Sequence, residues 1–68
     1  MQKWEYQFVV VSKTHAGFWR VSLVNEQDIF PQPSLHDYSN QVGNDGWELI
    51  SDNVSSTERE MVFKRPRQ

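Results

Sequence analysis

The chain has 68 residues, a formal net charge of −2 at pH 7 and no cysteine. This length allows a single small domain, residues 1–68, and chains this short bury only about 60% of their unfolded surface, so tight packing or self-association has to stabilise the fold. The composition excludes disulfides and thiolate zinc sites. The slightly acidic balance disfavours a general polyanion binder, because such domains are usually strongly basic.

Residues 3–12 are predicted to form the first strand, because apolar residues recur at every second position. The alternating set consists of Trp4, Tyr6, Phe8 and Val10. We expect these four side chains to face the core. Val9 and Val11 make the opposite side apolar as well near the end of this strand. A strand that is apolar on both sides is usually central in its sheet.

Residues 18–24 are predicted to form a second strand after a polar hairpin connection. Trp19, Val21 and Leu23 lie on one side of this strand, with Arg20 and Ser22 on the other. This half-polar pattern is typical of an edge strand.

Residues 25–33 are predicted to be an irregular connector, because Pro31 and Pro33 cannot donate ladder hydrogen bonds. Ile29 and Phe30 are apolar within this loop. We expect both side chains to anchor the loop to the core, with contact to a ligand as the alternative role for Phe30.

Ser34 is predicted to begin a short helix, because its hydroxyl can cap free backbone amides and Asp37 sits at the acidic position of a capping box. An apolar stripe follows at helical spacing: Leu35, Tyr38, Ser39 and Val42. The helix is expected to end at or near Gly43. About nine residues make a rod of roughly 14 Å, which covers only the middle of one sheet face.

Residues 47–52 and 58–65 are predicted to form the third and fourth strands, and Pro66 ends the last one. The fold class is therefore α+β, a four-stranded antiparallel sheet with one short helix on one face. Counted along the chain, the expected strand order is 2-1-3-4, because sequential strands tend to be neighbours. Residues 66–68 are expected to be a basic tail.

Glu5 and Glu48 stand at equivalent places on two strands expected to be adjacent. Opposite charges across a sheet stabilise it modestly. Their candidate partners are Arg20, Lys64 and Arg65.

Three separated motifs resemble one known family. They are Lys3-Trp4-Glu5-Tyr6, Gly46-Trp47-Glu48-Leu49 and Phe63-Lys64-Arg65-Pro66. The chain is similar in these motifs, over nearly its whole length, to the small bacterial proteins of domain-of-unknown-function family 4177. Residues 18–33 depart from the simplest family pattern, in which the first strand leads more directly to the helix. The resemblance implies a small α+β domain and no activity, since the family carries no established catalytic set.

No catalytic, cofactor or metal motif is found in the sequence. His36 and Asp37 are adjacent on the predicted helix, so their side chains diverge. Two histidines without cysteine do not make a metal spacing. The Gly-rich segment 43–46 follows a helix, whereas a phosphate loop precedes one. We therefore predict a protein that is not an enzyme and that needs no cofactor.

Val9, Val11, Ile50 and Val62 lie opposite the expected core aromatics and predict a second apolar sheet face that the helix cannot reach. A small barrel that buries both apolar sets is the structural alternative. The leading hypothesis is a self-associating interaction module, or one bound to a larger protein. Its candidate contacts are Val9, Val11, Trp19, Arg20, Phe30, Ile50, Val62, Lys64 and Arg65.

Two other functions are kept as hypotheses. One is binding of single-stranded nucleic acid by sheet aromatics and the basic tail. The other is small-ligand or nucleotide sensing or sequestration at a subunit interface, with Trp19, Phe30 or Trp47 lining the pocket. Neither a secretory signal nor a membrane span is recognised, so a cytoplasmic protein without membrane contact is expected.

Overall fold

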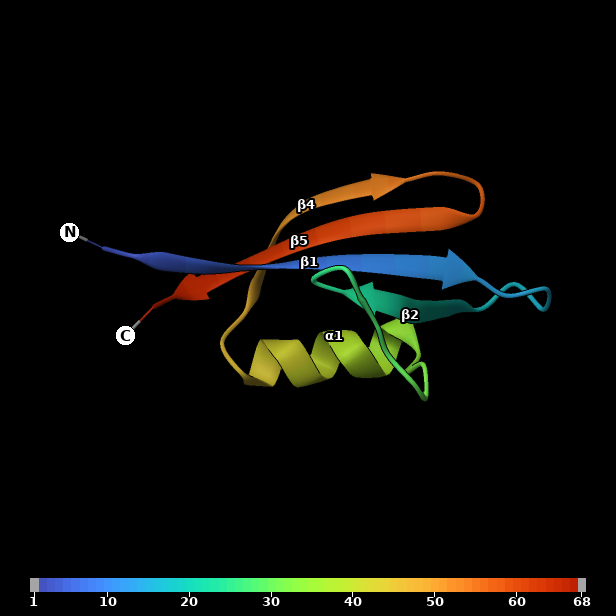
Figure 1. The fold of residues 1–68 in the computed structure, drawn as a ribbon, viewed down its shortest axis with the longest axis horizontal. Helices are drawn as coiled ribbons and strands as arrows, with labels where there is room; N and C mark the ends of the chain where they lie inside the picture. Colours follow the sequence, from blue (N-terminus) through green and yellow to red (C-terminus); the bar gives the residue numbers. More distant parts are fainter. Residues whose placement is uncertain (1, 68) are drawn as a thin grey trace.

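The structure, a computed structural model, describes residues 2–67. The elements in chain order are β1 (Trp4–Lys13), β2 (Trp19–Val24), β3 (Gln27–Asp28), α1 (Leu35–Asn44), β4 (Glu48–Val54) and β5 (Glu58–Pro66). One antiparallel sheet of order β3-β2-β1-β5-β4 carries α1 on one face (Figure 1). The predicted α+β class is confirmed, whereas the predicted count of four strands is wrong.

The strand order also differs from the expected one, because β5 and not β4 lies beside β1. These two strands pair along nine residues, from Trp4 opposite Pro66 to Ser12 opposite Glu58. They are the two longest strands, so their pairing makes the longest hydrogen-bonded ladder in the sheet. The chain therefore crosses one face of the sheet through α1 and reaches β4 at the far edge (Figure 1).

The fifth strand comes from a tight turn in the segment expected to be irregular. Asn25 and Glu26 both have positive φ, 51° and 66°, as the mirror-image turns of two-residue hairpins require. Asn25 tolerates this conformation well, and its Oδ1 accepts a hydrogen bond of 3.0 Å from the backbone N–H of Phe8. The turn was missed because no glycine marks it.

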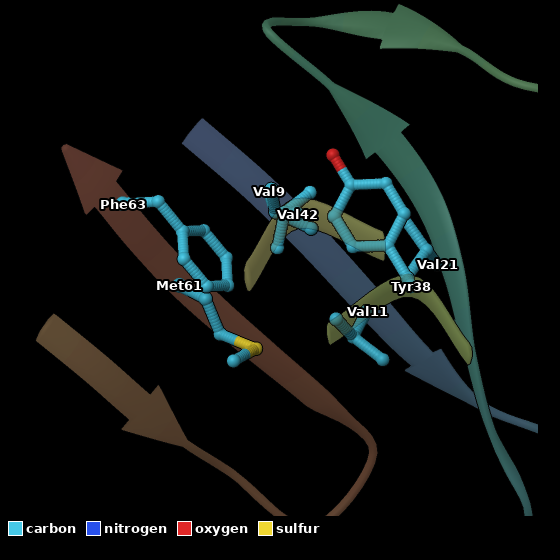
Figure 2. Close-up of a cluster of buried hydrophobic side chains, with 7 residues drawn as sticks. All are labelled: Val9, Val11, Val21, Tyr38, Val42, Met61 and Phe63. Carbon is cyan, nitrogen blue, oxygen red and sulfur yellow. The ribbon is translucent and has the colours of Figure 1, made fainter. Parts of the chain in front are cut away.

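The core lies between α1 and one face of the sheet, and Figure 2 shows its seven buried side chains. They are Val9, Val11, Val21, Tyr38, Val42, Met61 and Phe63. Tyr38 and Val42 come from α1, and burial raises the pKa of the Tyr38 phenol.

The expected orientation of β1 is therefore wrong. Val9 and Val11 are only 1% and 0% exposed, whereas Tyr6 and Phe8 of the opposite face are exposed. The partner strand decides the orientation, because Val9 stands opposite the buried Met61 in the β1–β5 register. A shift of one residue exchanges the two faces of a strand.

Irregularities in β2 and β4 change which face their residues join. Val10 is opposite Leu23 while Val11 is opposite Val21, so Ser22 is an extra residue in β2. Leu23 therefore shares a face with Val10 and leaves the side of Val21, contrary to the expected alternation. The register of β4 against β5 shifts in the same way at Ile50.

The helix begins as predicted. Ser34 caps it, and its Oγ accepts a hydrogen bond of 3.2 Å from the backbone N–H of Asp37. Gly43 lies inside the helix, which ends at Asn44, close to the expected position. Gly46, with φ of 88°, turns the chain towards β4. Trp47 follows directly and packs partly buried against the core.

Two expectations on irregular segments have different outcomes. Ile29 packs against the core, but Phe30 is 95% exposed and does not anchor its loop. In the expected tail, Pro66 is the last residue of β5, and the backbone N–H of Arg67 donates to the carbonyl of Lys3 at 2.8 Å. Residue 68 lies outside the described residues. Within residues 2–67, no helix has the length and apolar character needed to cross a membrane.

The corrected orientation of β1 can be tested with two valines. We expect Val11→Ala to lower the free energy of unfolding by about 2 kcal/mol, because it leaves a cavity in the core. Val54→Ala removes the same atoms from a side chain that is 60% exposed and should cost less than about 0.5 kcal/mol. Urea unfolding at one protein concentration measures both. Equal losses would contradict the assignment of faces.

Candidate functional site

The side of the sheet that α1 does not cover carries a row of apolar side chains. We call this set the uncovered face, and it consists of Tyr6, Phe8, Val10, Leu23 and Val62. Phe8 stands opposite Val62, and Val10 stands opposite Leu23. Tyr6 and Phe8 are 50% and 56% exposed although they belong to the central strand. Aromatic side chains in the middle of a sheet are thus left in water.

Two charged residues of β5 border the uncovered face. Lys64 and Glu60 stand two residues on either side of Val62, so all three point to the same side of the sheet. The Lys64 Nζ lies 4.2 Å from the centroid of the Trp4 ring. In the part of the chain that the structure describes, the ion pairs join Arg59 to Asp52 and Arg65 to Glu5. Lys64 and Glu60 therefore make no ion pair within residues 2–67.

The isolated chain exposes more surface than a compact monomer of its size. Its accessible surface is 5156 Å², against about 4,500 Å² expected for 8.1 kDa. Its radius of gyration is 12.4 Å, against about 11 Å expected for this length. The chain therefore exposes about 650 Å² more than a compact monomer of its mass.

The surplus arises because α1 is narrower than the sheet. Figure 1 shows α1 beside β2 and far from β4. Leu49 and Val54 stand in register with Phe63 and Arg59, on the side that carries α1, yet they are 47% and 60% exposed. Exposed apolar side chains therefore remain on the uncovered face, at Tyr6 and Phe8, and at the β4 edge of the other face.

Arg65, a predicted contact residue, instead holds together three parts of the fold. Its Nε pairs with Glu5, and its Nη1 donates to the carbonyl of Asp45 at the end of α1 at 3.0 Å. The guanidinium also lies 4.3 Å from the centroid of the Trp47 ring. The structure thus selects Arg65 among the expected partners of Glu5. Glu48 lies on β4, which is not adjacent to β1, and it stands opposite Lys64 of β5.

Three other predicted residues lie away from the uncovered face. Trp19 packs partly buried against the core, with the Arg59 guanidinium carbon 5.5 Å from the centroid of its ring. Phe30 is exposed in its loop, and Ile50, 45% exposed, stands at the register shift of the edge strand β4. These residues do not form one surface with Val62.

The predicted residues that reach the uncovered face are Val62 within it and Lys64 beside it. Arg20, exposed and opposite Ser12, lies at its margin, and its Nη1 donates to the carbonyl of Gln32 at 3.5 Å. Val9 and Val11 are excluded as contacts because the core buries them. Sequence reasoning missed the residues that replace them: Tyr6, Phe8, Val10, Leu23 and Glu60. The available signal was the unbroken aromatic alternation of β1, assigned to the wrong side.

Open hollows also lie along residues 2–67, among them one of about 270 Å³ beside Val54, Glu58 and Glu60. One of about 430 Å³ lies between the start of β2 and the start of α1, beside Trp19, Arg20 and Leu35. Another of about 560 Å³ lies beside Glu5, Asp45 and Arg65, whose polar groups already bond to one another. Among residues 2–67, no three His, Asp or Glu side chains are grouped to hold a metal ion. The uncovered face is therefore the surface of residues 2–67 on which large apolar side chains most clearly lack packing neighbours.

Comparisons of the chain with protein-family models, with curated proteins and with solved structures found no match.

The role of Arg65 leads to a stability prediction. Arg65→Lys should lower the free energy of unfolding by about 1 kcal/mol, because an ammonium group cannot bond Glu5 and Asp45 in one plane while stacking on Trp47. Arg67→Lys, a matched change near the end of the chain, should have no measurable effect. Urea unfolding followed by tryptophan fluorescence tests the pair. A loss at Arg67 as large as that at Arg65 would rule out this role.

Proposed function

We propose that this protein is a non-catalytic interaction module that associates with a second copy of itself through the uncovered face of its sheet. The observation that carries the proposal is the exposure of Tyr6 and Phe8 on the central strand. Large exposed apolar patches on soluble proteins usually mark interaction sites.

A second copy is the partner that the exposed side chains and small size of the chain favour. Covering the uncovered face with the same face of another subunit would remove Tyr6 and Phe8 from water on both copies. Small domains without disulfides or metals commonly gain stability in this way. Two sheets packed face to face lie about 10 Å apart, as in ordinary sandwiches.

The edge strand β4 offers a less suitable route to self-association. Its outer backbone groups have no neighbouring strand, and Leu49, Ile50 and Val54 are exposed along it. However, the register shift at Ile50 interrupts its regular alternation. Such irregularities are a usual protection of edges against pairing with another chain. The face, not the edge, is therefore the proposed interface.

Replacing an aromatic side chain of the uncovered face by a charged one tests this assignment. We expect the native protein to be a dimer by size-exclusion chromatography with light scattering, and Phe8→Glu to be a folded monomer by the same method and by circular dichroism. Phe30→Glu, which places the same charge on a side chain outside the face, should leave the dimer intact.

A native protein that stays monomeric from micromolar to millimolar concentration would refute self-association. A Phe8→Glu variant that remains a dimer would move the interface elsewhere.

One observation supports a second candidate function, single-stranded nucleic-acid binding. Tyr6 and Phe8 lie exposed on a central strand next to Lys64, and aromatic side chains on a sheet can stack on bases. Glu60 and Glu48 border the same face and would repel phosphates, so this candidate ranks second.

A fluorescence titration with a short oligonucleotide tests the second candidate. If it holds, affinity should fall at least tenfold between 50 and 200 mM salt, because phosphate contacts release counterions. Lys64→Gln should weaken binding further, whereas Lys3→Gln, away from the face, should not. Absence of binding at low salt removes the candidate.

The proposal includes membership in domain-of-unknown-function family 4177, supported by the three motifs of the chain. That family's lack of a catalytic set agrees with a non-catalytic role. A cytoplasmic location is likewise proposed, because a cysteine-free composition suits a reducing compartment.

A further inference from the structure

Building on the proposed function, we infer how the two copies are arranged: a two-fold axis crosses the strands at Phe8 and Val62, so that Lys64 of each copy meets Glu60 of the partner subunit. This arrangement rests on self-association through the uncovered face.

Along β5, a charged residue stands on each side of an apolar one on the uncovered face. Lys64, Val62 and Glu60 follow one another on the uncovered side, with about 7 Å between successive positions. On β1 the opposite residues are Tyr6, Phe8 and Val10, in that order. On β5 the face therefore has a cation, Lys64, and a carboxylate, Glu60, on either side of an apolar centre, while Glu48 of β4 stands opposite Lys64 and Arg20 of β2 lies at the other margin.

A two-fold interface must pair this pattern with itself. An axis across the strands places β5 over β5 in the reverse direction, with the Phe8–Val62 pair at the centre. Lys64 then faces the partner's Glu60, and Tyr6 faces the partner's Val10. Phe8 meets the partner's Phe8. Both charges are paired, and the two apolar rows lie over one another.

An axis along the strands, placed between β1 and β5, also brings the faces together. It keeps each residue at its own level and exchanges β1 with β5, so that Lys64 faces the partner's Tyr6. Glu60 would then face the partner's Val10. A carboxylate pressed against an apolar side chain without a partner is strongly disfavoured. Of these two arrangements, the axis across the strands is the one that pairs both Lys64 and Glu60 with opposite charges.

The observed state of the two charges agrees with this arrangement. Neither Lys64 nor Glu60 makes an ion pair within residues 2–67, so each remains available to a second subunit. Packed sheets are rotated by about 30° because of their twist, and both side chains are long and flexible enough to accommodate that rotation. The contact determines orientation more than affinity, as charged contacts at interfaces usually do.

Charge reversal in two separate proteins tests the register. In a dimer of the Lys64→Glu variant, the new glutamate of each copy faces Glu60 of the partner subunit. In a dimer of the Glu60→Lys variant, the new lysine of each copy faces Lys64 of the partner subunit. Each variant should weaken the dimer about tenfold or more. An equal mixture of the two should form a heterodimer with Kd within about threefold of the native value, because every contact then joins opposite charges. Sedimentation velocity measures all three.

The matched control changes the same charges away from the face. Lys3→Glu and Asp37→Lys, at exposed positions near the start of β1 and on α1, should each keep the native Kd, and their mixture should show no preference for heterodimers. Recovery of affinity in the first mixture also shows that both variants are folded.

The outcomes separate the two proposals. A native dimer whose charge variants bind normally, or fail to recover on mixing, overturns the register and leaves self-association in place. A native protein without any dimer overturns self-association and the register with it. Selective recovery in the mixture supports both.

Discussion

The pairing of β1 with β5 is the interaction on which the rest of the structure depends. These strands form the longest ladder of the sheet and bring nearly opposite ends of the chain together (Figure 1). Their register places Val9 and Met61 on one side, and Phe8 and Val62 on the other. Once that register is set, α1 can cover only the first side. The aromatic residues of β1 are left on the second.

The helix then limits how much of the sheet a single subunit can bury. Tyr38 and Val42 cover the valines of β1 and β2 and the apolar residues of β5, as Figure 2 shows. Arg65 fixes the far end of this layer, because it joins Glu5, the end of α1 and Trp47. The two layers, α1 and the sheet, enclose a packed core, but no helix covers the other face of the sheet within residues 2–67. This is the physical basis of the proposed self-association.

The arrangement of charges gives that face a direction. Arg59 pairs with Asp52 and Arg65 with Glu5 on the side of the helix. Lys64 lies over the Trp4 ring and opposite Glu48 of β4, and it makes no ion pair within residues 2–67. Glu60 stands four residues away on the same strand. An apolar patch alone would allow several ways of stacking two sheets. In the proposed dimer, Lys64 and Glu60 on either side of Val62 restrict the choice.

Local pattern determined the helix and most strands of this protein from the sequence itself. The Ser34 cap, the stripe through Tyr38 and Val42, and the alternation of the long strands depend on neighbouring residues only. Tertiary structure alone decided the strand order, the hairpin at Asn25 and the face that β1 buries. A strand that is apolar on both sides carries no local mark of its inner face. Only its pairing with β5 and the bulge in β2, which moves Leu23 beside Val10, make that choice.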